Sequence, residues 1–230
     1  MKTSGILDQL LKSGQDLIRQ KTGGQAAARS DQGGQLGNLL SGAGGGAVAA
    51  STIGLLLGSK MGRKMGGKVI TYGGLAALGV IAYKAFANWQ QQNAATAPQG
   101  QPRTVDRLPE SEAESHSSAV LRALIGAAKA DGHIDDRERQ LIHGEVTKLT
   151  GDQETQNWFD QELNKPLDPA EIAKSAATPE IAAEMYLASL LMVDEQNYME
   201  RSYLDELARQ MKLDPSLKAE LEKQAAEAAG

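Results

Sequence analysis

The chain of 230 residues contains no cysteine and only three histidines. The lack of cysteine excludes a disulfide framework, a thiolate metal site and a cysteine nucleophile. The three histidines have neither the spacing of a helical zinc pair nor an H-E-x-x-H motif. G-x-S-x-G and P-loop sequences are also lacking, so the chain carries no signature of an enzyme.

Acidic residues are scarce in the N-terminal part of the chain, and basic residues are outnumbered in the C-terminal part. Up to Arg103 there are 11 Lys/Arg and 3 Asp/Glu, a net charge of +8, and from Thr104 onward 13 Lys/Arg face 26 Asp/Glu, a net charge of −13. A basic front suits anionic lipid headgroups or nucleic acid, but the acidic remainder would repel both polyanions. We therefore expect membrane lipids as a partner, and no nucleic acid.

Residues 1–35 lack the uninterrupted apolar core of a cleavable signal peptide. Apolar and basic residues are instead mixed in a short amphipathic stretch, with Ile6, Leu7, Leu10, Leu11, Leu17 and Ile18 among Lys2, Lys12, Arg19 and Lys21. We expect this segment to be amphipathic and flexible.

Residues 36–89 are rich in glycine, and we expect them to associate with a membrane. The run from Val69 to Trp89 contains one charge, at Lys84, and is the best candidate for a transmembrane helix. The run from Gly42 to Ser59 is uncharged but is a weaker candidate because it contains so much glycine. The region is therefore expected to form either a single span or a helical hairpin.

Small residues recur at every fourth position of this region, as in a glycine zipper: Gly42, Gly46, Ala50, Gly54, Gly58, Gly62 and Gly66. Such a stripe lets a second helix approach closely in lipid, which predicts helix packing or a homo-oligomer. A flexible glycine-rich linker is the alternative. A basic cluster then contacts lipid headgroups or forms the turn of a hairpin: Lys60, Arg63, Lys64 and Lys68. The positive-inside rule leaves the side of the C-terminal domain open.

Residues 90–114 contain three prolines and few apolar residues, which predicts a flexible linker. Residues 115–230 have frequent helix-start signals, apolar residues at helical spacing and no alternating strand pattern, so we expect an all-α domain of about seven helices. The expected starts are Ser117 or Ser118, Asp135, Asp152, Asn197, and the cap-proline pairs Asp168-Pro169, Thr178-Pro179 and Asp214-Pro215.

The segment from Ala127 to Ile142, AAKADGHIDDRERQLI, contains the second half of an EF-hand loop, D-G-x-I-x-x-x-E. Ala127 and Lys129 stand where the loop would need its earliest carboxylates, which excludes a complete EF-hand. A looser copy, VDEQNYMERSYLDELA, begins at Val193. Two such halves facing each other would form an oxygen-only cluster suited to Ca²⁺, Mg²⁺ or Mn²⁺. The alternative is that these carboxylates form capping boxes and surface ion pairs.

DGHIDDRE followed by MERSYLDELA, within a domain of this kind, resembles the TerB-like tellurite-resistance superfamily. The basic glycine-rich segment ahead of it is similar to the YebE-type inner-membrane branch of that superfamily. The resemblance implies a divalent metal held by acidic residues of both halves, in this chain Asp131, Asp135, Glu138, Asp194 and Glu200. It also implies a place in the bacterial inner (cytoplasmic) membrane and a link to envelope or metal stress of the tellurite type, without catalysis.

We therefore expect a membrane-anchored, non-enzymatic TerB-like module that binds a divalent cation and an unidentified protein partner. The first alternative is a metal-free membrane scaffold that oligomerises through its glycine stripe and recruits partners. A hydrolase that uses a bound cation to activate water ranks last, because no substrate-orienting group is visible near the carboxylates.

Overall fold

The computed structural model describes residues 3–7, 78–95, 97–98, 100–130, 134, 136–193 and 197–229. Within these ranges all regular structure is helical, which confirms the all-α prediction. The elements are α6 (Leu78–Gln92), the 3-10 helix η2 (Val105–Arg107), α7 (Glu110–Ala128), α8 (Asp136–Leu149), α9 (Gln153–Asn164), α10 (Pro169–Ala173), α11 (Pro179–Met192), α12 (Tyr198–Gln210) and α13 (Pro215–Ala229). Residues 3–7 are also helical.

Most of the helix starts lie where the local sequence predicts them. Asp152, Asp168, Thr178 and Asn197 each precede a helix and accept a hydrogen bond from a backbone N–H of its first turn. Asp214 does the same for α13, where its Oδ1 accepts from Ser216 N at 2.8 Å. A side chain that satisfies one of the free N–H groups of a first turn fixes the helix start from sequence alone. The cap-proline prediction is confirmed at α10 and α11.

Helix α7 begins at Glu110, after Pro109, and not near Ser117. The serines expected to cap it lie inside the helix, where Ser118 Oγ donates to Ser115 O at 3.0 Å and Ser117 is buried. Serine can bond to a carbonyl of the preceding turn instead of capping, so its presence alone does not mark a start. Part of the segment expected to be a flexible linker therefore contributes η2 and the first turn of α7.

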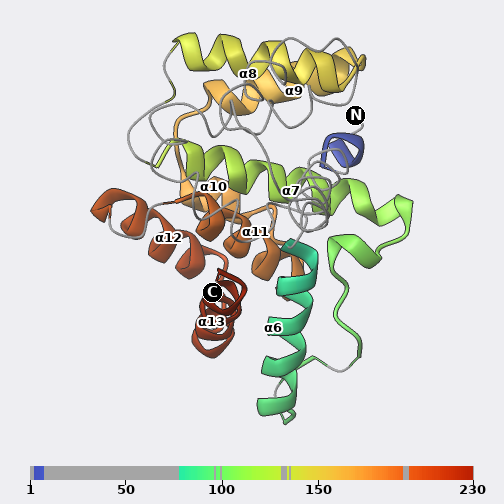
Figure 1. Ribbon diagram of the computed structural model, residues 1–230, viewed down its shortest axis with the longest axis vertical. Coiled ribbons are helices and arrows are strands. Elements are labelled where there is room, and N and C mark those ends of the chain that lie inside the picture. The colour runs from blue at the N-terminus through green and yellow to red at the C-terminus, as the bar shows by residue number, and fades with distance from the viewer. Residues whose placement is uncertain are drawn as a thin grey trace, which may run out of the picture.

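Helix α11 is the centre of the bundle. All of its residues from Ile181 to Met192 are buried, as expected for a helix that is apolar on every side. Figure 1 shows α7 beside α11, with α8 and α9 beyond α7, and α6 and α13 on the opposite side. Helix α12 contacts α10, α11 and α7.

The described part of the run from Val69 to Trp89 belongs to α6, which packs within the bundle. Its described residues pack against α13 and α11, and its buried face consists of Leu78, Gly79, Ile81, Ala82, Ala85, Phe86 and Trp89. Polar atoms of this helix also bond to α13, with Asn88 Nδ2 donating to Glu220 Oε1 and Trp89 Nε1 to Ser216 Oγ, both at 2.9 Å. None of the described helices is both long enough and apolar enough to span a bilayer.

The physical reason lies in the spacing of the apolar residues. Those of α6 recur at intervals of three and four residues and so form one face, which the bundle covers. Average hydropathy cannot distinguish such a face from a segment that is apolar all round. The glycine stripe and the basic cluster of Lys60, Arg63, Lys64 and Lys68 lie outside the described residues.

Candidate functional site

Helices α7 and α11 lie side by side and run in the same direction. Near their beginnings His116 Nδ1 lies 3.1 Å from Glu184 Oε2, and further along Ser189 Oγ donates to Ala123 O at 3.3 Å. Contacts between the two helices thus advance along both of them in the same direction. The C-terminal ends of α7 and α11 therefore lie at one end of the bundle.

Gly126, in the last turns of α7, permits a close approach of two other helices. A Cβ at this position would lie 2.4 Å from Ile172 Cδ1 on α10 and 2.5 Å from Tyr203 Oη on α12. Real Cβ atoms do not tolerate such distances, so a larger residue would require the side chains of Ile172 and Tyr203 to shift. Because Tyr203 lies on the first turns of α12, the beginning of α12 is held beside the end of α7.

Glu200 lies in this first part of α12, and its side chain is 4% exposed. Its Oε1 accepts a hydrogen bond from Asn197 Nδ2 at 2.9 Å, and Asn197 Oδ1 in turn accepts from Met199 N at 2.9 Å. The two side chains thus close the start of α12 together, in the manner of a capping box. A buried carboxylate carries a desolvation cost that hydrogen bonds or a nearby cation must offset.

The other predicted ligands cannot be located in the same way. Asp131, Asp135 and Asp194 lie outside the described residues. Glu138 lies in the first turn of α8, but its side chain is outside the described part. Among the side chains that are described, no group of three or more His, Asp and Glu is arranged to hold a metal ion. The five-carboxylate cluster therefore stays a prediction.

Arg139 fastens the segment that leads into α8. Its Nη1 lies 2.8 Å from Asp136 Oδ1 and its Nη2 donates to Ile134 O at 3.3 Å. Its Nε is buried and has no hydrogen-bond partner among the described atoms. Ile134 is itself buried in the main hydrophobic cluster, so both the guanidinium and the core hold this residue in place.

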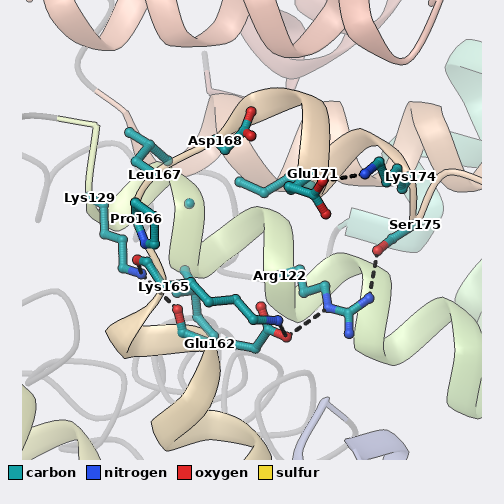
Figure 2. Close-up of a pocket in the computed structure, with 13 residues that line it drawn as sticks. Arg122, Lys129, Glu162, Lys165, Pro166, Leu167, Asp168, Glu171, Lys174 and Ser175 are labelled. Atoms are coloured by element: carbon teal, nitrogen blue, oxygen red, sulfur yellow. Dashed lines mark hydrogen bonds and ion pairs between the residues drawn. The ribbon is translucent and has the colours of Figure 1, made fainter.

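A cavity of about 440 Å³, which sequence reasoning did not predict, opens between α7, the end of α9 and α10 (Figure 2). Its charged lining consists of Arg122, Lys129, Lys165, Lys174, Glu162, Asp168 and Glu171. Volumes of this size are typical of small-molecule sites. Four of these seven side chains are cationic and three are anionic.

These cations are engaged with the protein. Arg122 Nε donates to Glu162 Oε1 at 3.2 Å and its Nη1 to Ser175 Oγ at 2.8 Å, while Lys165 Nζ lies 2.6 Å from Glu162 Oε1. Lys129 Nζ donates to the carbonyl oxygens of Glu162 and Lys165, at 2.7 and 2.8 Å, and so satisfies the C-terminal end of α9. Burial lowers the pKa of Lys129, although Glu162 opposes the shift. The cavity wall therefore fastens α9 to α7.

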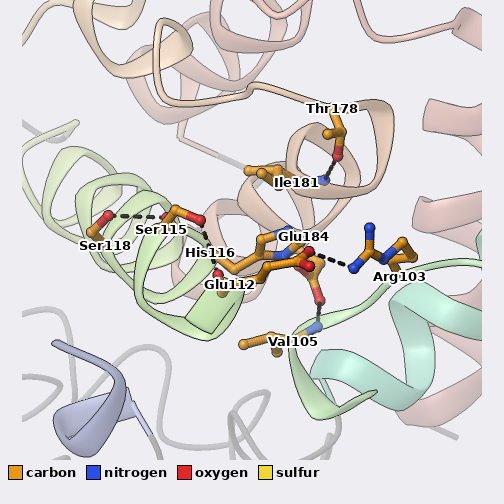
Figure 3. Close-up of polar contacts among 9 residues, drawn as sticks. All are labelled: Arg103, Val105, Glu112, Ser115, His116, Ser118, Thr178, Ile181 and Glu184. Carbon is orange, nitrogen blue, oxygen red and sulfur yellow. Dashed lines mark hydrogen bonds and ion pairs between the residues drawn. The ribbon is translucent and has the colours of Figure 1, made fainter. Parts of the chain in front are cut away.

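A second buried polar group joins α7, α11 and η2 (Figure 3). Glu184 is 0% exposed and His116 is 5% exposed. Glu184 Oε2 faces His116 Nδ1, and Glu184 Oε1 accepts from Val105 N at 2.5 Å. This carboxylate holds η2 against the centre of the bundle. Sequence reasoning missed it because a Glu within an apolar helix has no local partner.

Comparison with known proteins gives a family without an assigned activity. A family described as "Protein of unknown function (DUF533)" matches residues 42–225. A protein of Yersinia enterocolitica, described as "Uncharacterized protein in ampR 5'region", is 32% identical over 94 residues, which cover 41% of this chain and 68% of that protein. No solved structure matches the chain.

Proposed function

We propose a function from the premise that this chain belongs to the DUF533 family of proteins of unknown function. That family is TerB-like in general, in agreement with the resemblance carried by DGHIDDRE and MERSYLDELA. Our proposal is a membrane-attached, non-enzymatic TerB-like module that binds a divalent cation at the common end of α7 and α11. Its finer assignment is a YebE-type protein of the bacterial inner membrane, linked to envelope or metal stress of the tellurite type.

The observation that carries this proposal is the convergence of three chain segments. Asp131 comes three residues after the end of α7, and Asp194 comes two residues after the end of α11. The parallel packing of these helices supports placing both carboxylates at one end of the bundle. Glu200, buried at the start of α12, is brought to the same end by the contact of Tyr203 with Gly126.

A cation is the simplest partner for such an arrangement. Carboxylates that approach one another repel, and a buried one such as Glu200 also loses hydration. A hard divalent ion offsets both costs and takes six or more oxygen ligands, including backbone carbonyls and water. The chain has no cysteine, so Ca²⁺, Mg²⁺ and Mn²⁺ fit this oxygen-only chemistry better than zinc does.

Membrane attachment is assigned here to the part of the glycine-rich region that precedes α6. Residues from Leu78 to Trp89 contribute to the bundle core, so an anchor has to lie earlier in the chain. The stripe from Gly42 to Gly66 has the spacing that favours close helix packing in lipid, and Lys60, Arg63, Lys64 and Lys68 suit anionic headgroups. An unidentified protein partner or a second copy would pack against this stripe.

The cation proposal is tested by thermal unfolding of the full-length chain with and without each ion. A ligand that binds only the folded state stabilises it by about 2.7 kcal/mol at a hundredfold excess over its Kd. We expect Ca²⁺, Mg²⁺ or Mn²⁺ to raise the Tm of the wild type, and Glu138→Gln combined with Glu200→Gln to remove that rise.

The control is a double variant with the same change in net charge, Glu171→Gln combined with Glu227→Gln. Both of these glutamates are exposed, and each pairs with an exposed lysine, Lys174 or Lys84. The control should keep the full rise in Tm. A wild type whose Tm is indifferent to all three ions would remove the metal from the proposal.

The second candidate is the metal-free membrane scaffold. It is favoured by the hydrogen bonds by which Asn197 binds both Glu200 and the N–H of Met199 at the start of α12. In that case the carboxylates serve only as helix caps. The scaffold predicts no response of Tm to divalent ions, and a loss of stability in Glu200→Gln that is the same with and without them.

A further inference from the structure

Residues 3–7 bind to one carboxylate of the bundle, that of Glu114. Thr3 N and Thr3 Oγ1 donate to Glu114 Oε1 at 2.7 and 2.6 Å, and Ser4 N donates to Glu114 Oε2 at 3.1 Å. Glu114 belongs to α7, and residues 3–7 are helical. An anionic side chain at the first free N–H groups of a helix both satisfies those donors and complements the helix dipole.

The next side chains of this segment are buried. Ile6 and Leu7 are each 1% exposed and belong to the same hydrophobic cluster as Val120 and Leu121 of α7. Gly5, between them and the Glu114 contact, is exposed. One side of the segment therefore faces the bundle and the other faces outward.

The apolar side continues along the sequence with the spacing of an amphipathic helix. Ile6 and Leu7 are followed by Leu10, Leu11, Leu17 and Ile18. Residues 1–21 carry four Lys/Arg and two Asp/Glu, a net charge of +2. A helix with an apolar face and a basic polar face binds the surface of an anionic bilayer. The same positive charge also favours contact with the acidic bundle. The bundle and an anionic bilayer can therefore each bind this segment and bury its apolar face.

We propose that residues 1–21 are a lipid-binding segment of which residues 3–7 are stored on the bundle, and that an anionic membrane surface competes with Glu114 and the bundle core for residues 3–7. Ile6 and Leu7 can be buried in only one of these two places at a time. The stored helix has few residues, and so short a helix keeps little stability of its own once the contact to Glu114 is lost. The proposal uses the membrane attachment proposed above only to bring the bundle close to a bilayer.

Glu114 binds residues 3–7 in its charged form, as its hydrogen bonds indicate. Burial alone would raise the pKa of Glu114, but the donors of Thr3 and Ser4 together outweigh burial and hold the pKa below its ordinary value. Released from the segment, the carboxylate regains water. The free-energy difference between the stored and the released segment therefore comes from these hydrogen bonds and from the burial of a small apolar area. A bilayer can bury the same apolar area.

The absence of cysteine gives a direct experiment. Gly5→Cys introduces a single thiol at an exposed position where an added Cβ meets nothing within 4 Å, so it can carry a bimane fluorophore without disturbing the contact. The full-length labelled chain is mixed with vesicles of phosphatidylcholine and phosphatidylglycerol that contain brominated lipid. Brominated lipid quenches the fluorophore only when residue 5 lies in the membrane.

The test compares Glu114→Gln with Glu112→Gln. Both remove one negative charge from the same helix, but Glu112 pairs with Arg103, whereas Glu114 accepts the hydrogen bonds of Thr3 and Ser4. Hydrogen bonds to a charged acceptor are stronger than those to a neutral one, so Glu114→Gln should raise the ratio of quenched to unquenched chains about tenfold over the wild type and Glu112→Gln. Omitting phosphatidylglycerol should reduce this gain, and Ile6→Ser with Leu7→Ser should abolish it.

Equal quenching in the two variants would overturn the proposal, as would an absence of quenching in Glu114→Gln whose circular dichroism is unchanged. A loss of fold in Glu114→Gln would also overturn it, because a stored segment has to leave the bundle intact. The experiment is run with a chelator, so failure of the cation proposal does not affect it. If the wild type fails to bind vesicles, the glycine-rich anchor is wrong, yet Glu114→Gln should still bind through residues 1–21.

Discussion

Replacing Gly126 by alanine tests how closely α10 and α12 approach the end of α7. The new methyl group would lie 2.4 Å from Ile172 Cδ1 and 2.5 Å from Tyr203 Oη. The isoleucine methyl is the end of a flexible side chain and can move aside. Tyr203 is a rigid ring that is buried against the core, so relief of the second contact requires a shift of α12.

The magnitude follows from two opposing effects. Alanine is better than glycine within a helix by about 1 kcal/mol, and overpacking a well-filled core costs about 1–3 kcal/mol. Gly144, within α8, provides the matched control, because an added Cβ there meets nothing within 4 Å. Gly144→Ala should therefore stabilise the chain by up to about 1 kcal/mol. The difference between the two variants isolates the packing cost of about 1–3 kcal/mol.

Urea unfolding followed by circular dichroism measures both free energies. We expect Gly126→Ala to be less stable than Gly144→Ala by this difference, with the same dependence on urea. Because the shift moves the first turn of α12, Gly126→Ala should also weaken the effect of divalent ions on Tm, and Gly144→Ala should not. Equal stabilisation by both substitutions would refute the close approach on which the site geometry depends.

Two further predictions concern the carboxylates of Glu184, which is buried, and of Glu114, which is partly buried. Glu184→Ala leaves His116 and the N–H of Val105 without their partner in the core and should cost about 3–5 kcal/mol in urea unfolding, whereas the exposed Glu171→Ala should change stability by less than about 0.5 kcal/mol. Because the pKa of Glu114 is lowered when residues 3–7 are bound, the contact is at full strength above the ordinary pKa of glutamate and is lost as the pH falls through the lowered value. Fluorescence anisotropy of the label at Gly5→Cys should therefore drop in acid, and Glu114→Gln should show no such transition.

The helix starts could be predicted because their causes are local. A cap such as Asp168 and the proline after it act within one turn, so the sequence alone carries the signal. The prediction of the start of α7 was wrong because that start depends on tertiary packing, which is not local in the sequence. Ser117 has a capping side chain, but burial of its neighbours on α11 keeps that part of the chain helical.

Helix α6 shows that the mean hydropathy of a segment does not report how its apolar residues are spaced. Its apolar residues suggested a membrane span, yet their spacing describes one covered face, and the polar Asn88 and Trp89 Nε1 find partners on α13. Those partners lie more than a hundred residues away in sequence. Only the tertiary structure reveals that a helix so far from the C-terminus belongs to the same core.

The candidate site divides along the same line. The sequence reveals the acidic residues and the similarity of the two halves. It does not reveal that α7 and α11 run in parallel, or that Gly126 leaves room for the side chain of Tyr203 on α12. Lys129 illustrates the limit: in the sequence it only argues against a complete EF-hand, whereas in the structure its ammonium group closes the end of α9. Its partners are backbone carbonyls, and a pattern of side chains in the sequence does not predict such contacts.

The central claim is that the joint end of α7, α11 and α12 holds a divalent cation through carboxylates of both halves. Isothermal titration of the metal-free full-length chain with Ca²⁺, Mg²⁺ and Mn²⁺ tests it most directly. The account predicts saturable binding of at least one of these ions, weakened about tenfold or more by Glu200→Gln and unchanged by Glu171→Gln. Identical titrations of the wild type and Glu200→Gln would contradict it.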